Sequence, residues 1–193
     1  MNQDKESLKW FTTVYLLAGT SKQREVWSIL DRLQLLERLE TYRPVLIGTL
    51  PIDIDVAGSD INIGCEVYDD RQLQEDLSLI FDSISFPKRD GYFLAHTYCD
   101  GFEIEFYGEP KPVSSQNGFR HMLVEARLLE FGGEKIKNDI REMKQKGIET
   151  EAAFARDLGL SGDPYQALLE LEVSDDRELL NLCNKDILKA QGF

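Results

Sequence analysis

The spacing of hydrophobic residues predicts helices in the first part of the chain. Apolar residues at helical intervals predict a short helix over residues 5–18, which Gly19 ends. A longer helix is expected to begin with Ser21 as its N-cap and to continue to about Glu40. Pro44 breaks this pattern, and the apolar run VLIG that follows predicts a short strand.

The pattern changes to strands in the middle of the chain. Alternating apolar and polar residues predict a strand over residues 61–66, and an amphipathic pattern predicts a helix from Asp70 to about Ser83. Residues 92–99 and 102–107 predict two further strands, joined by the turn CDG. Because Gly48–Asp60 is punctuated by Gly, Pro and Asp, we expect a loop there.

The remainder of the chain is predicted to be helical. Helical patterns cover residues 116–131, 134–146, 150–158, 164–171 and from Ser174 to about Lys189. The expected fold is therefore α/β (α+β), with a small mixed sheet flanked by helices and a C-terminal helical region. We expect an α/β core over residues 1–110 and a helical region over 111–193 that packs on it, or one single domain.

Composition excludes several classes of protein. Hydrophobic residues make up 42% of the 193, too many for a disordered chain. Cys65, Cys99 and Cys183 are odd in number and widely spaced, which argues against a disulfide framework or a zinc site. The N-terminus lacks a signal-peptide pattern, and no apolar run approaches the ~20 residues of a membrane span. We therefore expect a cytoplasmic protein without a membrane partner.

The net charge of −13 is concentrated in one segment. Residues 51–110 hold 14 acidic and 3 basic residues, whereas residues 111–147 hold 5 acidic and 8 basic residues. The overall charge argues against a general nucleic-acid coat, because phosphates are repelled by most of such a surface. An acidic segment followed by a basic one is instead suited to a metal on one side of a site and a phosphate on the other.

Oxygen-bearing side chains recur in the acidic segment. The turn Gly48-Thr49 closes a predicted strand, and ten residues later the run Asp60-Ile61-Asn62 begins the next. Side chains two residues apart on a strand lie on the same face. Asp60 and Asn62 therefore point the same way, and so do Glu103 and Glu105. If these strands are neighbours, up to four oxygen ligands converge, which is the kind of donor set that Mg²⁺ binds together with substrate phosphates.

This pattern resembles the nucleotidyltransferase superfamily of the DNA polymerase β type. The matching residues are Ile47-Gly48-Thr49, then ten residues, then Asp60-Ile61-Asn62, with a third carboxylate on a later strand. The resemblance implies that Gly48 and Thr49 bind a triphosphate and that the carboxylates hold magnesium, which activates a hydroxyl and stabilises the leaving pyrophosphate. The sequence also resembles, more narrowly, a bacterial family labelled as a domain of unknown function. The resembling stretches are YRPVLIGTLPIDIDVAGSDINI, FEIEFYGEPKPVSSQNGFRHMLVEARLL and GIETEAAFARDLGLSGDPY.

Two residues depart from the superfamily pattern. Thr49 replaces the usual Ser or Gly and adds a methyl group to the phosphate turn. Asn62 stands where the second carboxylate is expected, and an amide oxygen ligates a hard cation without contributing charge. Asp53 and Asp55, in the preceding loop, are candidates to compensate for that charge.

Each candidate also has a purely structural interpretation. Ser59 either contacts phosphate or caps the turn before the strand. Glu103 and Glu105 could form the solvated face of an amphipathic strand. Arg120 is either a phosphate contact or a partner of acidic residues, and His121 is either an acid/base group paired with Glu125 or a packed, hydrogen-bonded histidine.

The leading hypothesis is a nucleotidyltransferase-like protein that uses Mg²⁺ to transfer a nucleotidyl group from a nucleoside triphosphate to an unknown hydroxyl acceptor. In it, Asp60 is the principal metal ligand, Glu103 or Glu105 is the second carboxylate or the general base, and Asn62 and Asp53 are weaker candidate ligands. The alternative is a catalytically degenerate member of the same fold that binds a nucleotide or a protein. A third possibility is an acidic protein-binding module. Nucleic acid is expected only as a small acceptor, and the sequence predicts no oligomeric state.

Overall fold

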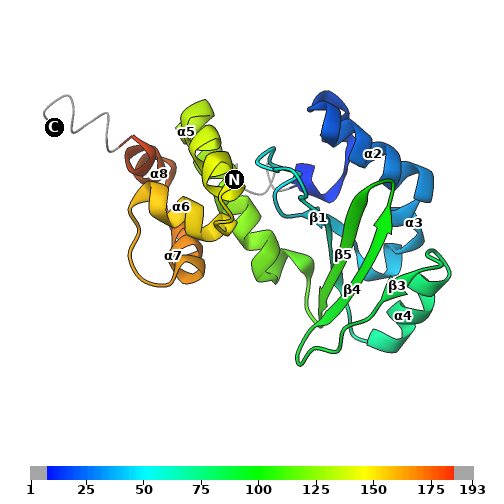
Figure 1. The fold of residues 1–193 in the computed structure, drawn as a ribbon. Coiled ribbons are helices and arrows are strands. Elements are labelled where there is room, and N and C mark those ends of the chain that lie inside the picture. Colours follow the sequence, from blue (N-terminus) through cyan, green and yellow to red (C-terminus); the bar gives the residue numbers. More distant parts are fainter. Residues whose placement is uncertain (1–7, 185–193) are drawn as a thin grey trace, which may run out of the picture. The chain divides into compact units, whose positions relative to one another are not determined.

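The computed structural model describes residues 8–184, which form two compact units. Unit 1 comprises the described residues up to Asp53 together with Gly58–Phe119. Unit 2 comprises the short segment Ile54–Ala57 and the described residues from Arg120 onward. Most helices and strands of both units are labelled in Figure 1.

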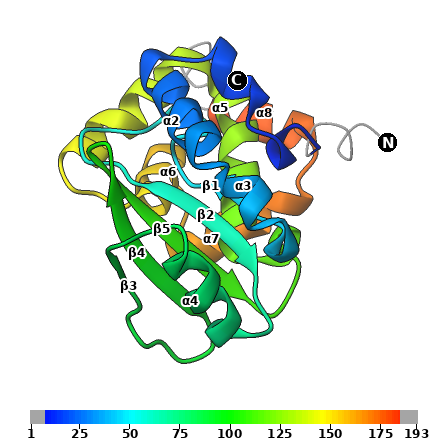
Figure 2. The ribbon, with the colours of Figure 1, turned by 90° about the vertical axis from the view of Figure 1, so that its right-hand side faces the viewer.

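Unit 1 is built on a mixed β-sheet, as the sequence predicts. The described strands are β1 (Val45–Ile47), β2 (Ile61–Glu66), β3 (Ile84–Ser85), β4 (Phe93–Cys99) and β5 (Phe102–Glu109). They lie in the order β1-β2-β5-β4-β3, with β2 and β5 parallel and every other neighbouring pair antiparallel. The parallel pair places two strands that are far apart in sequence side by side at the centre of the sheet (Figure 2).

The sheet has one apolar face and one polar face. Burial alternates strictly along β5, where Phe102, Ile104 and Phe106 are buried and the residues between them are half-buried. The buried side chains form a core with those of α2 (Ser21–Leu33), α3 (Leu35–Arg38) and α4 (Asp70–Ser78). These helices cover the apolar face and leave the polar side chains of β2, β4 and β5 on the other.

The N-terminal helices differ in detail from the prediction. The described part of residues 5–18 forms two 3₁₀ helices, Lys9–Phe11 and Val14–Ala18, rather than one α-helix, and Gly19 follows the second. Apolar residues spaced by three fit the 3.0-residue turn of a 3₁₀ helix as well as the α-helical one, so their spacing alone does not separate the two.

The helix that follows is capped and interrupted differently from the prediction. Thr20, not Ser21, is the N-cap of α2, and its side chain forms a capping box with Gln23. The helix does not reach Glu40, because Gln34 adopts a left-handed conformation with φ of 49° that separates α2 from α3. A 3₁₀ turn, Glu40–Tyr42, completes the segment.

Two features near α4 also differ from the prediction. The helix ends at Ser78 rather than near Ser83, and β3, with two residues, was not predicted. A strand this short carries too few residues to show an alternating pattern. Its register is fixed by β4, where Ile84 lies opposite Thr97, and the Thr97 hydroxyl donates to the Ser83 carbonyl at 2.6 Å.

Unit 2 is helical in its described residues. Helix α5 (Asn117–Gln145) begins in unit 1, and at Gly133, with φ of 59°, its backbone leaves the helical conformation. The helices that follow are α6 (Thr150–Leu158), α7 (Pro164–Glu170) and α8 (Asp176–Cys183). The predicted continuation of the last helix to about Lys189 lies outside the described residues. From Leu8 to Asn184, no helix combines the length and apolar character needed to cross a membrane.

Candidate functional site

The strand register brings the predicted site residues of the sheet onto its polar face. Asn62 on β2 lies directly opposite Glu105 on the parallel strand β5. On the other side of β5, Glu105 lies opposite His96 and Glu103 lies opposite Tyr98. Residues opposite one another on paired strands share a face, so these five side chains occupy one surface. We call this surface the carboxylate face.

Asp60 joins the carboxylate face through a hydrogen bond. It precedes β2, and its Oδ1 accepts a hydrogen bond of 2.9 Å from Asn62 Nδ2. Gly48 lies beside this pair, because a Cβ placed at that glycine would be 3.2 Å from Asn62 Nδ2. Its φ of 82° is in the left-handed region, where glycine is favoured. The turn that begins with Gly48 therefore passes close to Asn62, with Thr49 half-buried next to it.

Glu103 is held by two neighbours on β4 that the sequence did not single out. Its Oε1 lies 3.1 Å from His96 Nδ1, and its Oε2 accepts a hydrogen bond of 3.0 Å from the Tyr98 hydroxyl. Tyr98 is 73% exposed, so this hydrogen bond lies at the open edge of the face. The sequence signal for both was available: alternation along the predicted strand 92–99 places His96 and Tyr98 on one side.

Glu105 has a different environment from Glu103. Its Oε2 is 3.8 Å from His96 Nδ1, and it is the more buried of the two side chains. Burial raises the pKa of Glu105, and the negative charge of Asp60 raises it further, whereas His96 acts in the opposite direction. Glu105 is thus the carboxylate that shares its surroundings with Asp60, and Glu103 is the one fixed by hydrogen bonds.

The loop before β2 is anchored to helix α2. The buried side chain of Gln23 donates hydrogen bonds from Nε2 to the carbonyls of Leu50 and Pro51, at 2.8 and 3.2 Å. The same side chain closes the capping box at the start of α2. Gln23 therefore fixes the segment that follows the Gly48 turn, although nothing in the local sequence marks it as part of a site.

The other predicted residues of this loop lie in different surroundings, and Asp53 is the one that lies in a turn. Asp53 has a φ of 57°, and its N–H donates to the Leu50 carbonyl at 3.3 Å. Ser59 is half-buried, immediately before Asp60. The segment that contains Asp55 belongs to unit 2.

Arg120 and His121 belong to unit 2 and have partners there. The Arg120 guanidinium forms a bidentate pair with Glu172, with Nε and Nη2 at 3.1 and 2.6 Å from Oε2. His121 Nε2 is 3.0 Å from the Tyr165 carbonyl, and its Nδ1 is 3.5 Å from Glu151 Oε1. Both side chains thus have structural partners within unit 2, and a phosphate at Arg120 would have to compete with Glu172.

The carboxylate face satisfies part of the requirement for magnesium. Within residues 8–184, no group of three or more His, Cys, Asp or Glu side chains is placed to hold a metal ion, so Asp53 does not complete a three-carboxylate set with Asp60 and Glu105. Magnesium is commonly held by one or two carboxylates plus substrate phosphates, and Asp60 with Glu105 fits that arrangement. Asn62 presents an N–H donor to Asp60, so its oxygen would have to turn toward the ion to ligate it.

The arrangement of this chain matches solved nucleotidyltransferases. A cytoplasmic RNA terminal U-transferase aligns with a TM-score of 0.54 at 15% identity, over 92% of this chain and 70% of that protein. The Cid1 poly(U) polymerase bound to MgGTP aligns with a TM-score of 0.52 at 15% identity, over 68% of this chain and 46% of that protein. The chain spans about half the length of the solved Cid1 structures. The fold is that of the nucleotidyltransferases.

A match of the amino-acid sequence to a family profile shows which family the chain belongs to. The profile of the domain of unknown function DUF4269 matches residues 28–171, and the chain belongs to that family. No curated protein matches the chain in sequence. Gly48, the whole carboxylate face and the first part of unit 2 all lie inside the matched region.

Proposed function

We propose that the carboxylate face is the site of a nucleotidyl transfer from a nucleoside triphosphate to a hydroxyl acceptor. The observation that carries the proposal is that Asn62 hydrogen-bonds to Asp60 and lies opposite Glu105 on a nucleotidyltransferase-type sheet, beside the left-handed turn at Gly48. Two neighbouring carboxylates repel one another, and a divalent cation between them relieves that repulsion. The solved Cid1 structures were determined with Mg and nucleotide, which supports the same kind of ligand here.

The residues of the face take distinct roles in this proposal. Asp60 and Glu105 would hold Mg²⁺, with Asn62 as a weak ligand. When bound, the ion would neutralise charge on the triphosphate and the departing pyrophosphate. The turn Gly48–Thr49 would contribute backbone N–H groups to the phosphates, because a glycine with positive φ lets the backbone approach a ligand closely.

Glu103 would receive the proton of the acceptor hydroxyl. Its carboxylate is 37% exposed and already oriented by His96 and Tyr98, so it is accessible and fixed in position. As the acceptor oxygen bonds to the α-phosphorus, the bond from that phosphorus to the β-phosphate oxygen breaks and pyrophosphate leaves. The proton of the hydroxyl passes to Glu103, whose carboxylate is held in place by His96 and Tyr98.

A second function, nucleotide or protein binding without transfer, is favoured by one observation. The hydrogen bond from Asn62 to Asp60 occupies an oxygen that would otherwise face a metal ion, and Asn62 brings no charge of its own. Under this alternative, the fold retains the phosphate turn but lacks the anionic ligands needed for catalysis.

Calorimetric titration with Mg²⁺ and each nucleoside triphosphate tests the proposal. We expect saturable binding by the wild-type protein, and loss of metal-dependent binding in Asp60→Ala. Glu66→Gln is the matched control, because it removes one negative charge from β2 on the same side of the sheet, away from Asp60. Absence of nucleotide binding in the wild type would exclude both transfer and nucleotide binding, and would leave only protein binding.

Pyrophosphate release across a screen of hydroxyl acceptors separates transfer from binding alone. Release by the wild type that is lost in Glu105→Gln supports transfer. Binding without release in any acceptor supports the binding function. The variant Asn62→Asp restores the expected second carboxylate, and release that appears only in this variant would show that Asn62 is what prevents catalysis.

A further inference from the structure

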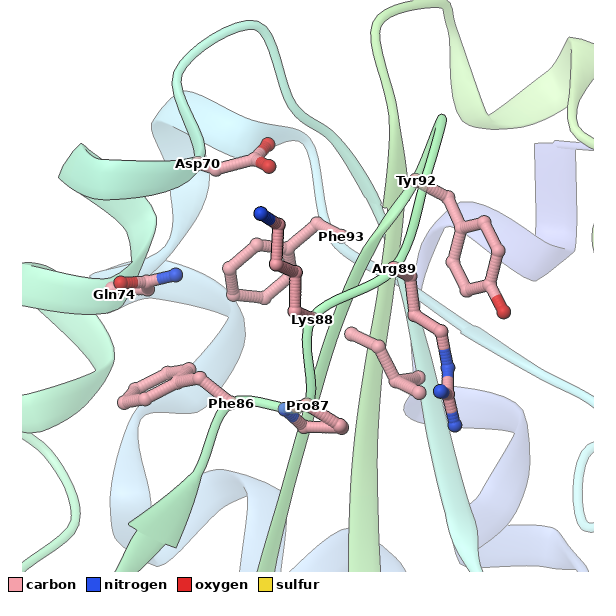
Figure 3. Close-up of a pocket in the computed structure, with 9 residues that line it drawn as sticks. Asp70, Gln74, Phe86, Pro87, Lys88, Arg89, Tyr92 and Phe93 are labelled. Carbon is pink, nitrogen blue, oxygen red and sulfur yellow. The ribbon is translucent and has the colours of Figure 1, made fainter.

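A cavity lies in unit 1, outside the set of residues that form the carboxylate face. It has a volume of about 370 Å³ and lies between helix α4 and the segment that joins β3 to β4 (Figure 3). This volume falls in the range of small-molecule sites, which is about 300–1,000 Å³. None of the residues of the carboxylate face lines it.

The cavity gathers positive charge in an otherwise acidic segment. Lys88 and Arg89 both line it, and they are two of the three basic residues among residues 51–110. Neither forms an ion pair with another residue in the described part of the chain. Figure 3 shows the Lys88 ammonium on the side of α4, whereas Arg89 extends on the other side of the segment. Both side chains are exposed, so an anion at this cavity could reach Lys88 on the side of α4.

The floor of the cavity is aromatic. Phe86 and Phe93 lie with their ring centroids 6.3 Å apart and their planes at 57°. Phe93 is buried against the core and Phe86 is half-buried, so Phe86 offers ring surface to a ligand while Phe93 supports it from below. Aromatic rings pack favourably on other rings, which favours a flat ring over a flexible aliphatic chain.

Helix α4 adds hydrogen-bonding groups opposite the cations. Asp70 and Gln74 line the cavity and lie four residues apart, which places them on one face of the helix. A carboxylate accepts a hydrogen bond from an exocyclic amino group, and an amide both donates and accepts, so together they match the edge of a purine or cytosine base.

We propose that this cavity binds a single nucleotide whose base carries an exocyclic amino group. The phosphate lies at Lys88, the base lies on Phe86, and the base edge meets Asp70 and Gln74. Inorganic phosphate alone would leave the aromatic floor unused, and a purely apolar ligand would bury the Lys88 ammonium without a partner. The nucleotide is either free or the end of a short oligonucleotide. The proposal does not rest on the function of the carboxylate face.

Titration with AMP, GMP, CMP and UMP tests this site. EDTA is included to remove divalent cations, so that metal-dependent binding at the carboxylate face does not contribute. We expect saturable binding of the first three and weaker binding of UMP, which lacks an amino group. Lys88→Gln should weaken binding about tenfold, through the loss of a charge-assisted hydrogen bond to phosphate. Arg71→Gln is the matched control, because it removes the third basic residue of the same segment, an exposed side chain on α4 that does not line the cavity.

The variant Asp60→Ala separates this site from the carboxylate face, since it should leave metal-free AMP binding unchanged. In an NMR titration, AMP should shift the side-chain amide resonances of Gln74 and leave those of Asn62 in place. Absence of saturable binding of all four nucleotides would overturn the proposal, and so would binding that Lys88→Gln leaves unchanged. If a short oligonucleotide binds more tightly than AMP, and Arg89→Gln removes this additional affinity, the ligand is the end of an oligonucleotide chain. If the oligonucleotide and AMP bind with equal affinity, the ligand is the free nucleotide.

Discussion

Replacing Glu125 with glutamine should stabilise the protein at neutral and higher pH. Glu125 lies on α5 in unit 2 and is 3% exposed. Its pKa is raised from 4.5 to about 8, mainly by burial and in addition by the negative charge of Glu151, while Lys144 acts in the opposite direction. The folded protein therefore holds this proton over a pH range in which the unfolded chain releases it.

The size and sign of the effect follow from linkage. Each step of one in pKa corresponds to about 1.4 kcal/mol. Below pH 4.5 the carboxyl is neutral in both states, so its burial carries no ionisation cost. As the pH rises from 5 to 8, the unfolded state is increasingly favoured, by a total of about 3.5 kcal/mol, and above a pH of about 8 the cost changes little further.

Urea unfolding of the wild type and Glu125→Gln at several pH values measures this cost. Glutamine is neutral throughout, so the stability gain of the variant should be below about 1 kcal/mol at pH 5 and about 4 kcal/mol at pH 8. Far-UV circular dichroism is the suitable signal, because Trp10 and Trp27 both belong to unit 1 and their fluorescence would not follow unit 2. The control is Glu130→Gln, an exposed residue on the same helix. A stability difference that does not vary between pH 5 and 8 would refute the reasoning, since Glu125 would then be as readily ionised in the folded protein as in the unfolded chain.

Three further predictions concern the carboxylate face and its loop. Gly48→Ala should lower the free energy of unfolding in urea by about 1–2 kcal/mol, because the position has a positive φ. It should also shift the Asn62 side-chain amide resonances, whereas strain confined to the turn would leave them unchanged. Gln23→Ala should cost about 2–3 kcal/mol, because two loop carbonyls lose their donor, and should increase hydrogen exchange in the loop after Gly48; unchanged exchange would contradict this anchoring role. Tyr98→Phe should cost less than about 1 kcal/mol, since its hydrogen bond to Glu103 is exposed, yet lower the rate of pyrophosphate release without changing nucleotide affinity.

The sequence predicted the sheet better than the helices around it. Period-two alternation and the CDG turn are local signals, and they located β2, β4 and β5 to within two residues. The break at Gln34 was not predictable in this way, because glutamine is an ordinary helix residue with no local preference for the left-handed conformation that it adopts. β3 was too short to show a pattern at all.

The side chains that hold the site in place were harder to predict than the acidic residues themselves. Asp60 and Glu105 stand out because carboxylates at that spacing suggest a metal. The role of Gln23 depends on a contact 27 residues away, to the Leu50 carbonyl, which no local pattern encodes. His96 lies on the predicted hairpin, but its position over Glu103 depends on the register of β4 against β5.

The short segment Ile54–Ala57 has a consequence for how the chain is made. It belongs to unit 2, yet the 62 residues of Gly58–Phe119 separate it from the remainder of that unit. At about 5–20 residues per second, a ribosome needs roughly 3–12 s to synthesise them. Unit 2 therefore cannot form around Ile54, whose side chain is fully buried in the finished protein, until that time has passed. The segment thus leaves the ribosome well before most of the unit to which it belongs, so unit 2 is the last part of the protein that can be completed.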